Sequence, residues 1–305
     1  ITPAAWTTFM TGKGPGQHGI LDFEKYDAGE HRLTFNRTYQ IEEKTRWELL
    51  SEKGLRVGSI NVPMTWPPQP MPPGSYLVSG METPSSDSPF TDPAELASDL
   101  RAMGYVCDLR VKLHERDVGS PAGVTSVAHD LLHVLQRREA AIFKLFHERP
   151  TDVLTVVFET PDRLQHWAWR AIDELLAAKD APQSRPATAL HEAVETCYRE
   201  LDRIVGRLLR EATGPHTHVF LLSDHGFGPL HSRFHADQWL AEQGWLVYDA
   251  GKAALRQRLR QPLRAVKRLV PRPLLRRGRQ ALAVNRIIDW QHTQAYSGRT
   301  MEHAI

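Results

Sequence analysis

The 305-residue sequence predicts an α/β fold in which a mostly parallel central sheet is flanked by helices on both faces. Short apolar runs rich in β-branched residues alternate with longer segments of helical periodicity, which is typical of βαβ units. Two of these runs lead directly into acidic and histidine residues, and α/β folds place their functional sites at such strand ends. The length suits one large domain or two smaller ones.

The individual elements follow from the period of the apolar residues. Strands are predicted at residues 57–62, 76–79, 153–158 and 218–223. Helices are predicted at residues 3–10, 41–53, 93–103, 124–147, 161–178, 187–211 and 236–243. Strands separated by helices of this length are expected to form a sheet with both faces covered.

Two segments are interpreted as insertions on this scaffold. The first, residues 84–93, is rich in Pro and Ser, and the second, residues 252–286, has twelve Lys or Arg and no Asp or Glu. The leucines of the second segment keep an approximately helical spacing that prolines interrupt. We interpret this basic segment as a cap with a solvated face that attracts anionic substrates, and binding to nucleic acid or anionic lipid is the alternative.

Composition places the chain among folded, soluble proteins. The formal net charge of +2, with 24% charged and 41% hydrophobic residues, excludes disordered and fibrous classes. Cys107 and Cys197 lie far apart and outside any Cys-x-x-Cys pattern, which argues against a disulfide scaffold and favours a reducing compartment. With no run of about 18 apolar residues to span a bilayer, a cytoplasmic location is expected.

The ends of the chain lead to a further expectation. The sequence starts at Ile1 rather than at methionine, and it stops at Ile305 without a polar tail. We expect native sequence to be missing from both ends, and a targeting signal could have been lost with it.

The first candidate site follows the apolar run at residues 218–223. Asp224 and His225 come next, so a carboxylate and an imidazole are expected at a strand's carboxyl end. A turn with a local hydrogen bond is the structural alternative for this pair.

A second acid and histidine pair follows the apolar run at residues 153–158. Thr160 suits a helix cap and Pro161 suits the first helical position, which puts Asp162 in the first turn. His166 comes four residues later on the same helix face, so both side chains can converge on one cation. The alternative is that His166 is a histidine satisfied at an interface between elements.

The start of the chain adds a candidate nucleophile. Thr2 immediately precedes a helix led by Pro3, so its hydroxyl is expected near the positive end of that helix. A threonine alkoxide bound to metal can attack phosphorus, and Thr2 can also be a simple N-cap. The glycine-rich residues 12–19 follow a helix and lack the Gly-Lys-Ser/Thr ending, which excludes a Walker-type phosphate loop.

Read together, these motifs resemble the type I phosphodiesterase and nucleotide pyrophosphatase branch of the alkaline phosphatase superfamily. The resemblance is carried by Thr2-Pro3-Ala4-Ala5-Trp6-Thr7, His18-Gly19-Ile20, Thr160-Pro161-Asp162 to His166, and Ser223-Asp224-His225-Gly226. Similar segments at residues 61–68, 79–84 and 289–297 extend it over essentially the whole chain. It implies an alkaline-phosphatase-like core in residues 1–250, a basic helical cap in 251–287 and a return to the core in 288–305.

The resemblance also implies roles for the candidate residues. Thr2 matches the nucleophile and bridges two divalent metal ions, most simply Zn²⁺, with Mn²⁺ or Mg²⁺ as alternatives. Asp162 and His166 match the ligands of one ion, and Asp224 and His225 match those of the other. The family's upstream aspartate and downstream histidine have no match here, and His231, His235 and His303 are only weak candidates for the histidine.

The expected function is metal-dependent hydrolysis of a phosphate ester through a covalent threonine intermediate. Phosphodiesters and nucleotide pyrophosphate bonds are the favoured substrates, although Phe23 replaces an asparagine typical of nucleotide pyrophosphatases. Trp6 stands where a sulfatase would have arginine, so sulfate esters are disfavoured. The alternative is a degenerate scaffold that binds nucleic acid or anionic lipid through the basic segment.

Overall fold

The computed structural model describes residues 1–27, 32–108, 120–180, 188–232, 234–254, 288–289 and 291–295. The chain divides into two compact units. The first comprises Ile1–Phe23 and Asn36–Pro229, and the second comprises Glu24–Phe35 and Leu230–Ile305. The predicted boundary at residue 287 lies outside the described residues, and the predicted boundaries at residues 250 and 287 both stay predictions.

The first unit is built on a four-stranded sheet in the order β5-β4-β3-β6. Its strands are β3 (Val57–Val62), β4 (Tyr76–Ser79), β5 (Thr91–Asp92) and β6 (Val153–Val156). β3 pairs in parallel with β4 and β6, while β5 pairs antiparallel with β4. The mostly parallel sheet is therefore confirmed, and the stretch interpreted as an insertion at residues 84–93 contributes its antiparallel edge strand.

Helices cover both faces of this sheet, as predicted. They are α1 (Thr2–Thr11), α2 (Pro15–His18), α3 (Arg46–Ser51), α4 (Leu96–Ala102), α6 (Pro121–Glu148), α7 (Thr160–Ala177) and α8 (Ala189–Glu211). Short 3₁₀ turns, η1 (Thr38–Gln40) and η2 (Ala178–Asp180), complete the unit. The predicted long helices match to within a few residues, whereas α3 is only half as long as the pattern at residues 41–53 suggests.

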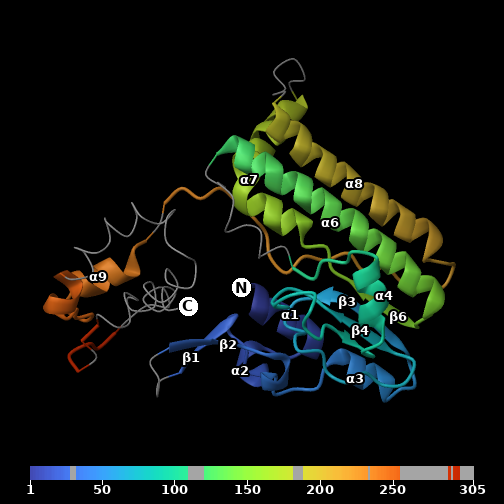
Figure 1. Cartoon of the computed structure of the whole chain (residues 1–305), viewed down its shortest axis with the longest axis horizontal. Helices are drawn as coiled ribbons and strands as arrows, with labels where there is room; N and C mark the ends of the chain where they lie inside the picture. Colours follow the sequence, from blue (N-terminus) through green and yellow to red (C-terminus); the bar gives the residue numbers. More distant parts are fainter. Residues whose placement is uncertain are drawn as a thin grey trace. The chain divides into compact units, whose positions relative to one another are not determined.

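The two faces of the sheet contribute to different hydrophobic clusters because successive strand side chains point to opposite sides. On β4, Tyr76 and Val78 pack with α4 and α6, while Leu77 packs with Trp6 and Met10 of α1. A third cluster lies between α6, α7 and α8, which lie side by side in Figure 1. The sheet is thus the middle layer of the first unit.

A local irregularity in β3 shapes the strand end. Asn61 has a φ of 64°, in the left-handed region that few side chains adopt, and the pairing register with β4 shifts there. Val62 consequently joins the same cluster as Val57 instead of the cluster of Ile60. Gly80 fits against this bulge because an added Cβ would lie only 2.4 Å from the Asn61 carbonyl oxygen.

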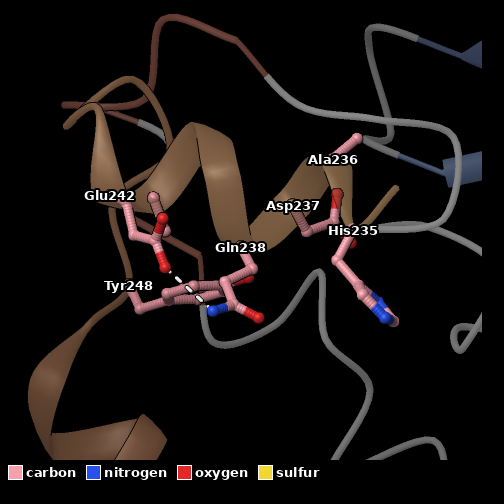
Figure 2. A pocket seen from close by; sticks show the side chains of 7 residues that line it. His235, Ala236, Asp237, Gln238, Glu242 and Tyr248 are labelled. Atoms are coloured by element: carbon pink, nitrogen blue, oxygen red, sulfur yellow. Dashed lines mark hydrogen bonds between the residues drawn. The ribbon is translucent and has the colours of Figure 1, made fainter. Parts of the chain in front are cut away.

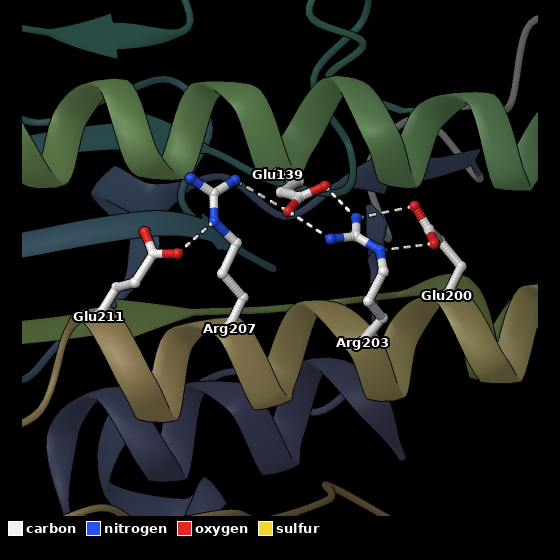
Figure 3. A network of polar contacts seen from close by, with 5 residues as sticks. All are labelled: Glu139, Glu200, Arg203, Arg207 and Glu211. Carbon is white, nitrogen blue, oxygen red and sulfur yellow. Dashed lines mark hydrogen bonds and ion pairs between the residues drawn. The ribbon is translucent and has the colours of Figure 1, made fainter.

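An ion-pair network joins α6 to α8 (Figure 3). Glu139 of α6, 11% exposed at its side chain, accepts hydrogen bonds from Arg203 and Arg207 of α8. Glu200 and Glu211 bind the same two arginines from within α8. These bonds hold the pKa of Glu139 below its usual range, with the Arg203 bond as the largest cause.

The prediction of a strand at residues 218–223 is wrong. This segment is extended but joins no sheet, and its apolar side chains Val219, Phe220, Leu221 and Leu222 are 51–89% exposed. The apolar run correctly reports β-propensity, but a strand also requires a hydrogen-bonded neighbour. Among the described residues, β6 is an edge strand that pairs only with β3, and residues 218–223 form no ladder with it or with any other strand.

The second unit contains a hairpin and a small helical cluster. β1 (Glu24–Asp27) pairs antiparallel with β2 (Arg32–Phe35). α9 (Ala236–Glu242), predicted at residues 236–243, contributes Leu240 to a cluster with Leu246 and Ile288. Most of the predicted basic cap, residues 255–287, lies outside the described residues. Within the described part of the chain, no helix has the length and apolar character needed to cross a membrane.

Candidate active site

The amino end of α1 positions Thr2. The Ala5 N–H donates to the Ile1 carbonyl at 3.0 Å, so Ile1 is the N-cap and Thr2 is the first helical residue. The interpretation of Thr2 as an N-cap is therefore wrong, and α1 has no side-chain cap hydrogen bond. Trp6 and Met10 bury the inner face of the helix. The Thr2 hydroxyl is thus left available at the positive end of a well-anchored helix.

The amino end of α7 positions Asp162 and His166. Glu159 is the N-cap, because its carbonyl accepts the Arg163 N–H at 3.0 Å, so the prediction that Thr160 caps this helix is also wrong. Asp162 falls in the first turn and His166 lies one turn later, as predicted. Asp162 Oδ1 and His166 Nε2 lie 3.5 Å apart, so the two side chains share one helix face.

Asp224 and His225 reach the same place from the loop that follows residues 218–223. His225 Nε2 lies 3.1 Å from Thr2 Oγ1 and 3.6 Å from both Asp162 Oδ1 and Asp224 Oδ2. All five predicted residues therefore lie in one group, although three separate segments supply them. The His225 and Asp224 side chains are 20% and 16% exposed, so the group borders solvent.

The hydrogen bonds of His225 define its tautomer. Its Nδ1 lies 2.9 Å from the Gly226 carbonyl oxygen, which can only accept, so Nδ1 bears the proton. The lone pair of Nε2 then points toward Thr2 and Asp162, and the Thr2 hydroxyl donates to it. Fixing the outer nitrogen in this way is the usual means of orienting a histidine that binds a metal or accepts a proton.

Aromatic rings form one wall of the site. The rings of Phe227 and His166 pack edge to face, with their centroids 4.8 Å apart. Phe227 also stacks on Trp169, with a centroid distance of 5.7 Å. His225 tilts toward the same ring at 5.9 Å. Phe227 therefore restricts both imidazoles, and its contact with Trp169 ties the Asp224 loop to α7.

The electrostatics of the site favour an ionised carboxylate. Burial acts to raise the pKa of Asp162, but the His166 hydrogen bond and the electrostatic influence of His166, Arg163 and His225 outweigh it. The net result is a pKa below the usual range of an aspartate. Asp162 is thus a carboxylate at neutral pH, as binding to a cation requires.

The side chains suit a divalent cation in their chemistry. Two carboxylates and two imidazoles are the donors that Zn²⁺ and Mn²⁺ accept. Asp224 Oδ2 is buried and takes part in no hydrogen bond, which leaves one carboxylate oxygen for a further ligand. The side chains of Asp162, His166, Asp224 and His225 are spaced as side chains that contact one another directly. Across the described ranges, no cluster of three or more His, Cys, Asp or Glu residues is arranged to hold a metal.

Two of the weak histidine candidates, His231 and His235, belong to the second unit. His235 lines a hollow of about 560 Å³ in the second unit, together with residues of α9 and Tyr248 (Figure 2). His231 is exposed in the same unit, and His303 lies outside the described residues.

Sequence reasoning missed a buried ion pair at the start of α7. Arg138 lies on the otherwise apolar face of α6 that includes Leu135 and Ile142, and it pairs with Glu159 in the core. An arginine at an apolar helical position was the available signal, because such a residue needs a buried partner.

Comparison with known proteins places the chain in a family. A crystal structure of phosphonoacetate hydrolase from Sinorhizobium meliloti 1021, in complex with phosphonoacetate, matches at 15% identity with a TM-score of 0.37. The match covers 67% of this chain and 42% of that one, so this chain spans less than half of that protein. No curated protein matches. The model of the type I phosphodiesterase / nucleotide pyrophosphatase family matches residues 1–277, and the chain therefore belongs to this family.

Proposed function

We propose that this protein hydrolyses phosphate esters in a metal-dependent reaction with Thr2 as the nucleophile. The observation that supports this most strongly is the 3.1 Å contact between Thr2 Oγ1 and His225 Nε2 beside Asp162. The family membership points to the same class of phosphoryl-transfer hydrolysis. Asp162 and His166 would hold one divalent ion, and Asp224 and His225 would hold the second.

Each residue has a defined task in this proposal. The bound ions would supply Lewis-acid stabilisation of the phosphoryl oxygens and of the leaving group. The Thr2 hydroxyl releases its proton to solvent water, favoured by the positive amino end of α1, and its oxygen attacks phosphorus. The bond from phosphorus to the leaving oxygen breaks, and that oxygen takes up a proton as the alcohol or phosphate departs.

The second half of the reaction regenerates Thr2. Water attacks the phosphorus of phosphorylated Thr2, and the bond from phosphorus to Oγ1 breaks. The Thr2 oxygen then regains a proton, and the phosphate product leaves. Two successive displacements through a covalent enzyme give ping-pong kinetics.

The proposed substrates are phosphodiesters or nucleotide pyrophosphate bonds, with Zn²⁺ as the first metal to try and Mn²⁺ or Mg²⁺ as alternatives. Phe23, partly buried against the cluster of Trp6 and Met10, supplies an apolar ring where the family's nucleotide enzymes have an asparagine.

The test is metal analysis of the full-length protein combined with hydrolysis of bis-p-nitrophenyl phosphate and p-nitrophenyl phosphate, with and without added Zn²⁺ or Mn²⁺. We expect bound metal and metal-dependent turnover, faster on the diester. Absence of both bound metal and turnover, together with salt-sensitive binding to nucleic acid or anionic vesicles, would favour the binding scaffold instead.

A further inference from the structure

The region behind the candidate active site contains a buried ion pair. Arg138 Nη2 of α6 lies 2.8 Å from Glu159 Oε1, and the two side chains are 1% and 3% exposed. Arg138 also donates to the carbonyl oxygens of Val106 and Cys107, at 3.4 and 3.3 Å. Glu159 is the residue whose carbonyl begins α7. The pair therefore connects the middle of α6 to the first residue of the helix with Asp162 and His166.

This pair is poorly satisfied for a buried one. Arg138 Nε and Nη1 and Glu159 Oε2 are buried atoms without a hydrogen-bond partner. Removing two charges from water is costly, and an ion pair in the core commonly adds less stability than apolar side chains of similar volume. Stability alone therefore gives little reason for an arginine on the apolar face of α6.

A second ion pair holds the same helix end one turn later. Arg163 Nη2 lies 3.1 Å from Asp108 Oδ1, and the two side chains are 13% and 2% exposed. Asp108 immediately follows Cys107, whose carbonyl Arg138 binds. Glu159 and Arg163 therefore lie on either side of Asp162 in sequence. Arg163 binds the segment at residues 106–108 directly, and Glu159 is linked to it through Arg138.

We propose that Arg138 and Glu159 are positioning residues that fix the amino-terminal turn of α7, and with it Asp162 and His166, for metal binding. The inference rests on the proposed function. Apolar packing of Leu164, Ala168 and Ile172 holds α7 along its length. Such packing alone leaves the first turn of α7 free to rotate about the helix axis and to shift along it. A directed hydrogen bond from Arg138 defines both, because guanidinium and carboxylate groups pair only in specific geometries.

The decisive variant replaces both charges, Arg138→Met together with Glu159→Leu, in the full-length protein. This change removes the directed contact without leaving a charge unpaired in the core. The matched control is Glu139→Leu with Arg203→Met, an ion pair from the next position of α6 that contacts α8 rather than α7. Zn²⁺ affinity by calorimetric titration, kcat and KM for bis-p-nitrophenyl phosphate, and melting temperature are measured for each.

We expect the Arg138/Glu159 double variant to stay folded, with Zn²⁺ affinity and kcat both lowered about 10–100-fold and KM little changed. The control should retain wild-type affinity and kcat. A folded double variant with wild-type Zn²⁺ affinity overturns the inference. A double variant that is unfolded at 25 °C also overturns it, because the pair would then hold the fold rather than the site.

The Asp162→Asn variant separates this inference from the proposed function. If Asp162→Asn keeps full Zn²⁺ affinity and turnover, the metal assignment itself fails, and the positioning role fails with it. If Asp162→Asn loses both while the Arg138/Glu159 double variant keeps both, only the positioning role is wrong. The single variants Glu159→Asp and Arg138→Lys should give intermediate affinities, since each preserves the charge but alters the reach.

Discussion

Thr2 Oγ1 and His225 Nε2 lie 3.1 Å apart, although 223 positions separate these residues in the sequence. The contact joins the amino end of α1 to the loop after residues 218–223, and Asp162 Oδ1 lies 3.6 Å from the same nitrogen. A hydroxyl, an imidazole and a carboxylate from three segments thus meet at two helix amino ends. This arrangement leads to two predictions about the chemistry, and two further predictions concern His18 and Gly80 in the scaffold.

Replacing Thr2 tests the nucleophile. Thr2→Ala should lower kcat/KM for bis-p-nitrophenyl phosphate by about 10³-fold or more, because no other oxygen can take its place at the end of α1. Thr2→Ser keeps the hydroxyl and should retain a measurable part of the activity. The control is Thr196→Ala, which removes an exposed hydroxyl that only binds the Glu192 carbonyl within α8. Wild-type turnover by Thr2→Ala would exclude Thr2 as the nucleophile.

Removing the metal tests the proposed ligands. Treatment with EDTA should abolish turnover, and added Zn²⁺ or Mn²⁺ should restore it in the wild-type protein. His166→Ala should weaken Zn²⁺ binding about 10–100-fold, so that restoration requires a higher metal concentration. The control is His129→Ala, which removes an exposed histidine of α6. Equal metal requirements for His166→Ala and the wild type would remove His166 from the ligand set.

A buried histidine near α1 predicts a pH dependence of stability. The Ile20 N–H donates to His18 Nδ1 at 3.1 Å, so Nε2 bears the proton and donates to Thr8 Oγ1, also at 3.1 Å. Burial lowers the pKa of His18 below its usual 6.5. The unfolded chain therefore binds a proton at higher pH than the folded one, and stability is fully present above pH 6.5 and falls as the pH drops below it.

This dependence is measured by urea unfolding between pH 7.5 and 5.5. His18→Gln should lower stability at pH 7.5 and should show a smaller further loss on acidification than the wild type. His129→Gln, which changes an exposed histidine, should keep the wild-type slope. Identical slopes for wild type and His18→Gln would contradict a neutral, buried His18.

The bulge at the end of β3 predicts a large effect of a small substitution. Gly80→Ala would bring a Cβ within 2.4 Å of the Asn61 carbonyl oxygen and 2.6 Å of the Val62 carbonyl oxygen. Backbone atoms cannot yield as a flexible side chain can, so the free energy of unfolding should fall by about 2–3 kcal/mol. Gly16→Ala, where no atom lies within 4 Å of the added Cβ, is the control and should be near neutral. Thermal unfolding of both variants measures these effects, and equal stability of Gly80→Ala and Gly16→Ala would contradict the prediction.

The order of helices and strands was largely predictable because periodicity reflects which side chains are buried. β3 and β4 match their predicted bounds, and α6, α7 and α8 match to within three residues. The prediction failed at residues 218–223, where the apolar run indicates a strand but the segment pairs with no strand of the described structure. Propensity is a local property, whereas strand pairing depends on which neighbours are present.

By itself, the sequence determined which side chains are candidates for the site. The motifs around Thr2, Asp162 and Asp224 identified the donor types, and the spacing of Asp162 and His166 placed both on one helix face. Only the tertiary structure decided that His225 faces Thr2 through Nε2, that Phe227 stacks against Trp169, and that Arg138 supports the start of α7. These contacts join segments distant in sequence, and their geometry depends on how those segments pack against one another, which no local pattern specifies.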